Sequence, residues 1–293
     1  MSKQFTFEAI GTHFWIEIFD EISDEELKAT QGRLELLSSV FNQEYSRFRP
    51  DSFISELNRE RILQNSTKEC RDLLSLGKEL YTQTEGVFNI LTGHILEARG
   101  YDAEYSFKAR EGVETLTMCN PLTDLNISKS EITLSCGNVD IGGYGKGYLI
   151  DKLARNLRGH GIKYFLVNGG GDMYGTSNHD EPIEIYLEHP TEDKKYLTKT
   201  TLLNQGFAAS SPFKRQWKHD EKTYTHIVSN NETPNLAVFV KAENGVLADA
   251  FSKACLLLSE NNLLQIAEPG TITFARFNPA TNQFWQTKGF DAI

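Results

Sequence analysis

One short segment of the chain combines residue types that could hold a phosphate group. Val139–Asp151 (VDIGGYGKGYLID) contains Asp140, four glycines and Lys146, and a run with helical spacing follows. Glycines leave backbone N–H groups accessible, and these groups can bind a diphosphate together with a helix N-terminus and a lysine. Lys146 is followed by Gly147 rather than Ser or Thr, which excludes a Walker A loop, and the glycine spacing does not fit a Rossmann fingerprint. The alternative is a tight turn with a solvated lysine.

A second segment, Ala248–Lys253 (ADAFSK), carries two opposite charges on a predicted helix. Asp249 and Lys253 are four residues apart, so they share one helix face. A buried aspartate near the start of a helix is either a cap of the N-terminus or a metal ligand. An ordinary ion pair between the two side chains is the third interpretation, and the segment alone favours it.

Three further segments could contact a ligand. His226 lies in the apolar run YTHIVS and has an unperturbed pKa of about 6.5, which suits a base, although such a histidine is more often a satisfied core residue. Phe48, between two arginines in SRFRPDS, could stack on a planar heterocycle or lie in the core. The glycines of VNGGGD (Val167–Asp172) either allow close approach of a ligand or form a plain turn.

Bulk composition excludes several classes of partner. The chain has 293 residues, of which 39% are hydrophobic and 24% charged, as in an ordinary globular protein. The net charge of −10 disfavours nucleic acid and anionic membranes as partners. No run approaches 18 apolar residues, so no membrane insertion is expected.

The cysteines and the first residues both favour a cytoplasmic protein. Four cysteines form no CxxC pair, which predicts reduced, buried thiols rather than disulfides or zinc ligands: Cys70, Cys119, Cys136 and Cys255. The first twenty residues contain neither a signal-peptide core nor an early cysteine for lipid attachment.

The order of strand and helix patterns predicts the fold class. Strand patterns dominate, and helices are interspersed without strict βαβ alternation, so we expect an α+β fold with mostly antiparallel or mixed sheets. Ser23 followed by Glu26 predicts a capped helix N-terminus. Gly159 and Gly161 predict the end of the helix that follows the glycine-rich segment.

Segments that are ambiguous one by one occur in a recognisable order. From about Ile10 to about Ser259 the chain resembles the ApbE family of FAD:protein FMN transferases. The resemblance is carried, in order, by IGT, YSRFRPDSFISELN, FNILTGHILEARGYD, VDIGGYGKGYLID, VNGGGD, FAASS, THIVS and ADAFSKACLLL. It implies an ApbE-like flavin transferase fold that forms a single domain over residues 1–293, with two intertwined α+β lobes and no clear linker.

The resemblance also implies an activity. Members of the family use FAD as substrate with Mg²⁺, transfer FMN through a phosphoester to a threonine of an acceptor flavoprotein, and release AMP. A fumarate-reductase-like flavoprotein is one acceptor of this kind. The alternatives are an FAD pyrophosphatase and a non-catalytic protein that binds or stores FAD.

By position, the resemblance assigns roles to individual residues. His226 corresponds to the base on the acceptor hydroxyl, and Lys146 corresponds to a group that meets the charge of the phosphates. FAD contacts are implied for Ile10, Phe48, Phe88, Asn89, Asp140, Lys146 and Val228, the last in the same strand as His226. Asn89 stands where the family usually has Asp, and Ile10 where it usually has Met.

The metal site implied by the resemblance departs from the family at one ligand. Its three protein ligands correspond to the backbone carbonyl of Gly143, to Asp249 and to Lys253, which replaces a threonine. Lysine offers no oxygen, and its ammonium repels Mg²⁺. Either Mg²⁺ still binds through the other groups, phosphate oxygens and water, or the Lys253 ammonium takes its place. The substitution favours the binding-only alternative more than a threonine would.

Overall fold

The computed structural model describes residues 2–229, 233–258, 262–263 and 272–293. The chain divides into two compact units, each assembled from separate segments. Unit 1 consists of Met1–Asn42, Tyr144–Ser211 and Asn235–Ile293, and unit 2 of Gln43–Gly143 and Pro212–Pro234. The boundary between Gly143 and Tyr144 therefore falls inside the glycine-rich segment.

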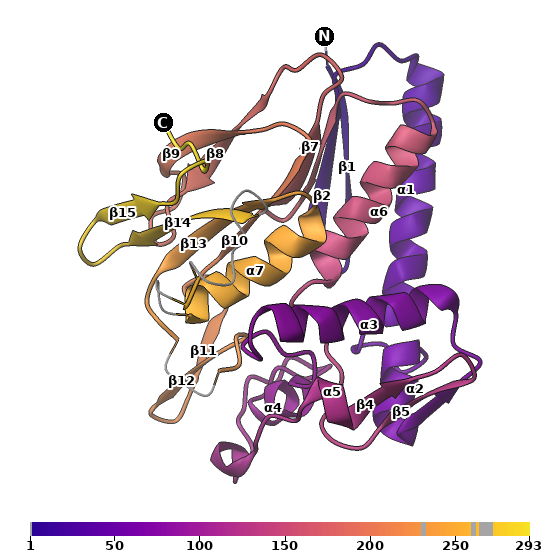
Figure 1. The fold of residues 1–293 in the computed structure, drawn as a ribbon, viewed down its shortest axis with the longest axis vertical. Coiled ribbons are helices and arrows are strands. Elements are labelled where there is room, and N and C mark those ends of the chain that lie inside the picture. Colours follow the sequence, from indigo (N-terminus) through magenta and orange to yellow (C-terminus); the bar gives the residue numbers. More distant parts are fainter. Residues whose placement is uncertain (1, 230–232, 259–261, 264–271) are drawn as a thin grey trace. The chain divides into compact units, whose positions relative to one another are not determined.

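Unit 1 is built on an eight-stranded sheet whose neighbouring strands are all antiparallel (Figure 1). This arrangement confirms the predicted α+β class. The strands, in sheet order, are β1 (Lys3–Ala9), β2 (Thr12–Ile18), β6 (Phe165–Gly169), β7 (Asp172–Thr176), β10 (Gln205–Ser210), β13 (Ala237–Ala242), β14 (Ile272–Asn278) and β15 (Gln283–Gln286). A separate hairpin pairs β8 (Ile183–Glu188) with β9 (Tyr196–Leu202).

Two helices pack on this sheet and on each other. Helix α6 (Gly145–Gly159) contacts β6 and β7, and α7 (Gly245–Leu257) contacts β10 and β13 (Figure 1). Helix α6 ends at Gly159, and Gly161 follows it with a φ of +87°, so the predicted end of this helix is confirmed. Helix α1 (Asp24–Tyr45) begins in unit 1, and its Glu26 N–H donates to the Ser23 hydroxyl at 3.1 Å, which confirms the predicted cap. In the described parts of the chain, no helix is long and apolar enough to cross a membrane.

The core of unit 1 explains the alternating burial along strand β8. A cluster of buried side chains joins the large sheet to the β8–β9 hairpin, including Leu166, Ile185, Leu187, Leu202, Phe207, Phe239, Phe277 and Phe290. Strand β8 shows the period of two that such packing requires, with every second residue buried. Two of the three glycines of VNGGGD, Gly170 and Gly171, form the two-residue turn of the β6–β7 hairpin, because Gly169 pairs with Asp172 across them; their φ angles are +63° and +98°.

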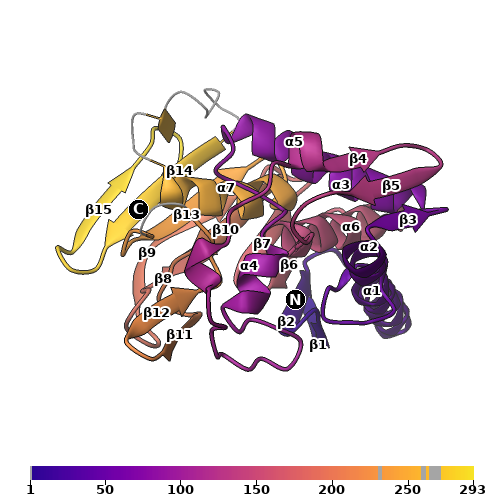
Figure 2. The same cartoon turned by 90° about the horizontal axis from the view of Figure 1, so that it is seen from below.

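Unit 2 contains most of the shorter elements. Strands β3 (Ile62–Gln64), β5 (Glu131–Leu134) and β4 (Leu125–Ile127) form a three-stranded antiparallel sheet beside α2 (Phe53–Glu60) and α3 (Lys68–Gln83) (Figure 2). The other elements are α4 (Gly93–Ala98), the 3-10 helix η1 (Val113–Thr115), α5 (Pro121–Asp124) and a hairpin of β11 (Gln216–His219) with β12 (Lys222–Thr225).

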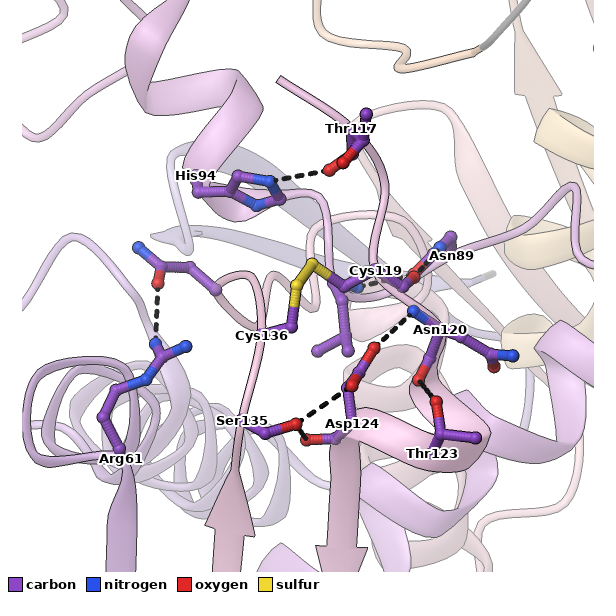
Figure 3. Close-up of a disulfide and its surroundings, with 12 residues drawn as sticks. Arg61, Asn89, His94, Thr117, Cys119, Asn120, Thr123, Asp124, Ser135 and Cys136 are labelled. Carbon is purple, nitrogen blue, oxygen red and sulfur yellow. Dashed lines mark hydrogen bonds between the residues drawn. A yellow bond between two sulfur atoms is a disulfide. The ribbon is translucent and has the colours of Figure 1, made fainter. Parts of the chain in front are cut away.

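The expectation that all four cysteines are reduced is wrong. Cys119 and Cys136 form a disulfide in unit 2, with their Cα atoms 5.8 Å apart (Figure 3). Sequence spacing did not reveal this pair because a disulfide depends on the distance between two Cα atoms in the fold. Cys70 and Cys255 are buried thiols, and burial raises the pKa of each to about 12, so both are unreactive. Disulfides persist in oxidising compartments, so the cysteines no longer support a cytoplasmic location.

The disulfide closes a loop with a sequence separation of 17 residues. We expect the double variant Cys119→Ser/Cys136→Ser to lose about 3 kcal/mol of unfolding free energy, because the open loop has more conformations in the unfolded chain. Urea denaturation with and without dithiothreitol measures this loss. The reductant should shift the wild-type curve and leave the variant curve in place; an unshifted wild-type curve would contradict the expectation.

Candidate functional site

In unit 1 the first turns of α6 and α7 are bonded to each other through two carboxylates. The Gly147 N–H of α6 donates to Asp249 Oδ2 at 2.9 Å. In return, the Gly245 and Val246 N–H groups of α7 donate to Asp151 Oδ1 and Oδ2 at 2.7 and 2.9 Å. The first N–H groups of a helix have no partner within the helix, so each aspartate satisfies the start of the other helix. Sequence reasoning did not assign this role to Asp151.

This pairing requires glycine at position 147 and leaves little room for a side chain at position 245. A Cβ atom on Gly147 would lie 2.3 Å from the Gly245 carbonyl oxygen and 2.8 Å from Asp249 Cβ. A Cβ atom on Gly245 would lie 3.0 Å from Asp151 Oδ1. The glycine-rich segment therefore brings two helix N-termini together, in addition to leaving its N–H groups accessible.

Two lysines neutralise the buried acids beside these N-termini. Lys146 forms an ion pair with Asp172, and Lys253 forms an ion pair with Asp249 Oδ1 and donates to the Asp249 carbonyl oxygen at 3.0 Å. Asp249 is 0% exposed. Burial alone raises the pKa of Asp249, but the charges of Lys146 and Lys253, the Lys253 hydrogen bond and the Gly147 N–H together lower it below its usual value. Asp249 is therefore a buried carboxylate, not the helix cap, because Asn244 caps α7.

The side chains of this part of α7 do not fit a divalent metal ion. Lys253 occupies Asp249 Oδ1, and the Gly147 N–H occupies Oδ2. Mg²⁺ binds oxygen ligands at about 2.1 Å, which would bring it close to the ammonium. A dication 4 Å from an ammonium costs about 8 kcal/mol at an effective dielectric constant of about 20. Gly143, the backbone ligand implied by the resemblance, belongs to unit 2.

In unit 2 a buried ion pair holds the other end of the glycine-rich segment. Arg47 Nε donates to Asp140 Oδ2 at 2.6 Å, and their side chains are 4% and 10% exposed. A second Arg47 nitrogen donates to the Tyr101 carbonyl oxygen at 2.8 Å. The other Asp140 oxygen accepts the Gly142 N–H. Asp140 thus shapes the turn that precedes Gly143. The sequence showed Arg47 only as one of the two cations beside Phe48, and did not predict its pairing with Asp140.

The predicted flavin-contact residues Phe88 and Asn89 are packed within unit 2. Phe88 is buried, and a Cβ atom on Gly143 would lie 2.8 Å from its ring. The Asn89 amide donates to the Cys119 carbonyl oxygen, while its Oδ1 accepts the Leu91 N–H, both at 2.8 Å (Figure 3). Asn89 therefore links its own segment to the disulfide.

Phe48 belongs to a cluster of aromatic rings. Its ring stacks on Tyr105 at 5.3 Å and meets Tyr101 edge-on at 5.7 Å, with the Arg47 guanidinium 4.2 Å from its centroid. Trp217 stacks on Tyr101 at 5.8 Å. We call Phe48, Tyr101, Tyr105, Phe107 and Trp217 the aromatic cluster; Tyr105 and Phe107 are its exposed members. The aromatic density of YDAEYSF, at Tyr101–Phe107, was the sequence signal for it.

His226 follows strand β12 rather than lying in it. The strand ends at Thr225, so the expectation of one strand carrying both His226 and Val228 is wrong. His226 Nδ1 lies 3.3 Å from the Arg215 carbonyl oxygen. The tautomer that donates this hydrogen bond carries its basic lone pair on Nε2.

Ile10 occupies a strained turn in unit 1. Ala9 pairs with Thr12 across Ile10 and Gly11, which have φ of +44° and +72°. A two-residue turn of this kind favours Asn or Gly at its first position, and a β-branched residue there is an outlier. Among the predicted site residues, unit 1 thus brings Lys146, Asp249 and Lys253 together, and Ile10 lies in a hairpin turn of the same unit.

Comparisons with known proteins agree with this fold. The model of the ApbE family matches residues 10–274. The FAD:protein FMN transferase of Escherichia coli (strain K12) is 21% identical over 279 residues, covering 88% of this chain and 78% of the relative. That of Haemophilus influenzae is 22% identical over 286 residues, covering 90% and 82%. An ApbE protein from Thermotoga maritima has a TM-score of 0.85 at 17% identity, covering 99% and 98%. Flavin transferase ApbE from Vibrio cholerae has a TM-score of 0.77 at 19% identity, covering 99% of this chain and 98% of that chain.

The reciprocal helix pairing has a pH signature at Asp151. Burial raises the pKa of Asp151 from 3.8 to about 6, although the Gly245 and Val246 N–H groups lower it. The folded state therefore holds this proton more tightly than the unfolded chain, so stability present below pH 3.8 is lost as pH rises through 6. We expect the unfolding free energy of wild type minus that of Asp151→Asn to fall by about 3 kcal/mol over this range. Urea denaturation across pH measures the difference, and a difference independent of pH would contradict it.

The strain at Ile10 can be relieved by substitution. We expect Ile10→Asn to raise the unfolding free energy by about 1 kcal/mol, because Asn tolerates positive φ better than a β-branched residue. Thermal or urea denaturation measures the gain. Ile10→Val is the matched control, since it keeps the β-branch and should bring no gain. Equal stability of the Asn and Val variants would argue against strain in this turn.

Proposed function

Because the chain belongs to the ApbE family, we propose that it transfers FMN from FAD through a phosphoester to a threonine of an acceptor flavoprotein and releases AMP. One observation in unit 1 carries the proposal. Two ammonium groups, those of Lys146 and Lys253, gather at the first turn of α6, in a chain whose net charge is −10. Each of these ammonium groups pairs with a buried carboxylate, but an ammonium has three N–H donors, so together with the helix N-terminus they suit an anionic diphosphate, which the rest of an acidic surface repels.

The reaction needs positioning and charge neutralisation more than covalent catalysis. The threonine oxygen attacks the phosphorus on the FMN side of FAD, and a P–O bond forms there. The P–O bond to the AMP phosphate breaks, and its electron pair leaves with AMP. The threonine proton passes to His226, whose Nδ1 is oriented by the Arg215 carbonyl oxygen.

The residues with proposed FAD contacts differ in their chemistry. In unit 1, Lys146 meets phosphate charge with the N–H groups of the α6 first turn. In unit 2, Phe48 and its aromatic cluster offer faces on which an isoalloxazine ring can stack. Asp140 acts by shaping the glycine-rich turn, since Arg47 and Gly142 engage its carboxylate.

The remaining contacts that we propose are apolar or structural. Ile10, Phe88 and Val228 supply apolar surface for the flavin, and Asn89 holds the backbone next to Phe88. We also propose that residues 1–293 act as one functional domain, because the segments of the two units alternate along the chain. A fumarate-reductase-like flavoprotein is a suitable acceptor, since its threonine hydroxyl supplies the nucleophile.

The proposal is tested by incubating the protein with FAD and a threonine-containing acceptor domain. We expect AMP and flavinylated acceptor in equal amounts. His226→Ala should slow transfer by about 10²- to 10⁴-fold while FAD still binds, because proton removal contributes that much. AMP release and in-gel flavin fluorescence measure the two products.

The matched control is His219→Ala, which removes another histidine of unit 2 from the end of β11. It should leave the transfer rate unchanged. AMP without flavinylated acceptor would instead identify an FAD pyrophosphatase. Tight FAD binding with neither product would identify a binding protein and refute the proposed transfer.

A further inference from the structure

Helix α7 holds an ammonium group in a position unusual for lysine. The Lys253 side chain is only 16% exposed, and its Nζ forms an ion pair with Asp249, which is fully buried. The same nitrogen donates to the Asp249 carbonyl oxygen at 3.0 Å. Lysines usually extend their stems so that the ammonium reaches water. Here the ammonium is turned back along the helix onto an interior carboxylate.

The charges around this carboxylate already balance. Asp249 Oδ1 contacts Lys253, and Oδ2 accepts the Gly147 N–H. The second buried acid of this site, Asp172, pairs with Lys146. Each of these two carboxylates thus has an ammonium partner among the described residues, so the pair Asp249–Lys253 already contains the positive charge that a bound metal ion would supply.

We propose that the Lys253 ammonium is a permanent cation that takes the place of a divalent metal ion at Asp249, so that FMN transfer needs no added Mg²⁺. The inference rests on the proposed FMN transfer. When the P–O bond to AMP breaks, negative charge gathers on the departing phosphate oxygen. A protein-bound ammonium offsets part of this charge, and its third N–H can donate to a phosphate oxygen, since the other two contact Asp249.

Two roles of Lys253, stabilising α7 and replacing a metal ion, predict different properties for the Lys253→Thr variant. If Lys253 only stabilises α7, its replacement by threonine weakens the fold and creates no new binding property. If Lys253 occupies the place of a metal ion, Lys253→Thr removes the ammonium, releases Asp249 Oδ1 and supplies a hydroxyl oxygen one helical turn away. Oxygen ligands of this kind are those that Mg²⁺ and Mn²⁺ take.

Metal binding without FAD or acceptor is the first test. Titration of each protein with MnCl₂ alone, followed by electron paramagnetic resonance of free Mn²⁺, measures affinity. We expect Lys253→Thr to bind about one Mn²⁺ per chain, at least about tenfold more tightly than wild type. Lys163→Thr, which removes an exposed lysine of the same unit, should bind like wild type. Wild type that binds Mn²⁺ as tightly as Lys253→Thr would overturn the proposal.

Metal dependence of transfer is the second test. Wild-type rates with Mg²⁺ and with EDTA should agree within about twofold, whereas Lys253→Thr should lose at least about tenfold in EDTA and recover with Mg²⁺. Lys253→Met, which removes the charge and adds no oxygen, should be slow under both conditions. A wild-type rate that falls at least about tenfold in EDTA and recovers with Mg²⁺ would overturn the proposal.

The two tests distinguish failure of the proposed FMN transfer from failure of the proposed role of Lys253. If neither wild type nor any variant transfers FMN, the proposed function fails, while the Mn²⁺ titration still decides the role of Lys253. Circular dichroism checks that each variant is folded. If Lys253→Thr does not fold, the Mn²⁺ titration of wild type decides: stoichiometric binding overturns the proposal, and lack of binding agrees with it.

Discussion

The candidate site of unit 1 depends on the reciprocal bonding of two helix N-termini. Asp249 of α7 accepts the Gly147 N–H of α6, and Asp151 of α6 accepts the Gly245 and Val246 N–H groups of α7. Each bond joins a carboxylate to the positive end of a helix, a charge-assisted interaction of about 1.5–3 kcal/mol. Because both helices also pack on the large sheet, the two first turns are held at a defined distance from each other.

The reciprocal bonding buries Asp249, and this burial explains why Lys146 and Lys253 lie beside it. A carboxylate as deeply buried as Asp249 is costly unless a cation or several hydrogen-bond donors stabilise its charge. One N–H group satisfies only one of its oxygens, so a second, positive partner is needed at the other. In this chain Lys253 supplies that partner from the same helix, and the charge of Lys146 also acts on Asp249. The Lys253 ammonium and a divalent metal ion are therefore alternative cations for balancing the charge of Asp249 between the two helices.

Local patterns in the sequence predicted local features well. Ser23 marked the start of α1, and the strand patterns predicted an antiparallel α+β fold. The i,i+4 spacing of Asp249 and Lys253 predicted their ion pair. Partners far apart in the chain were not predictable in this way, because no periodicity encodes them. Gly245 and Asp151 are 94 residues apart, and the Cys119–Cys136 disulfide was missed for the same reason.

In unit 2, the side chains of Asp140 and Asn89 bond to other groups of the protein. Asp140 and Asn89 were identified by position along the chain, which says nothing about the partners of their side chains. Arg47 and the Gly142 N–H engage the two oxygens of Asp140, and Asn89 bridges two backbone groups. In the proposed function, their effect on FAD therefore passes through the backbone that they hold, next to Gly143 and Phe88. In the proposed function, the residues that meet phosphate charge directly are the lysines, because their ammonium groups carry positive charge.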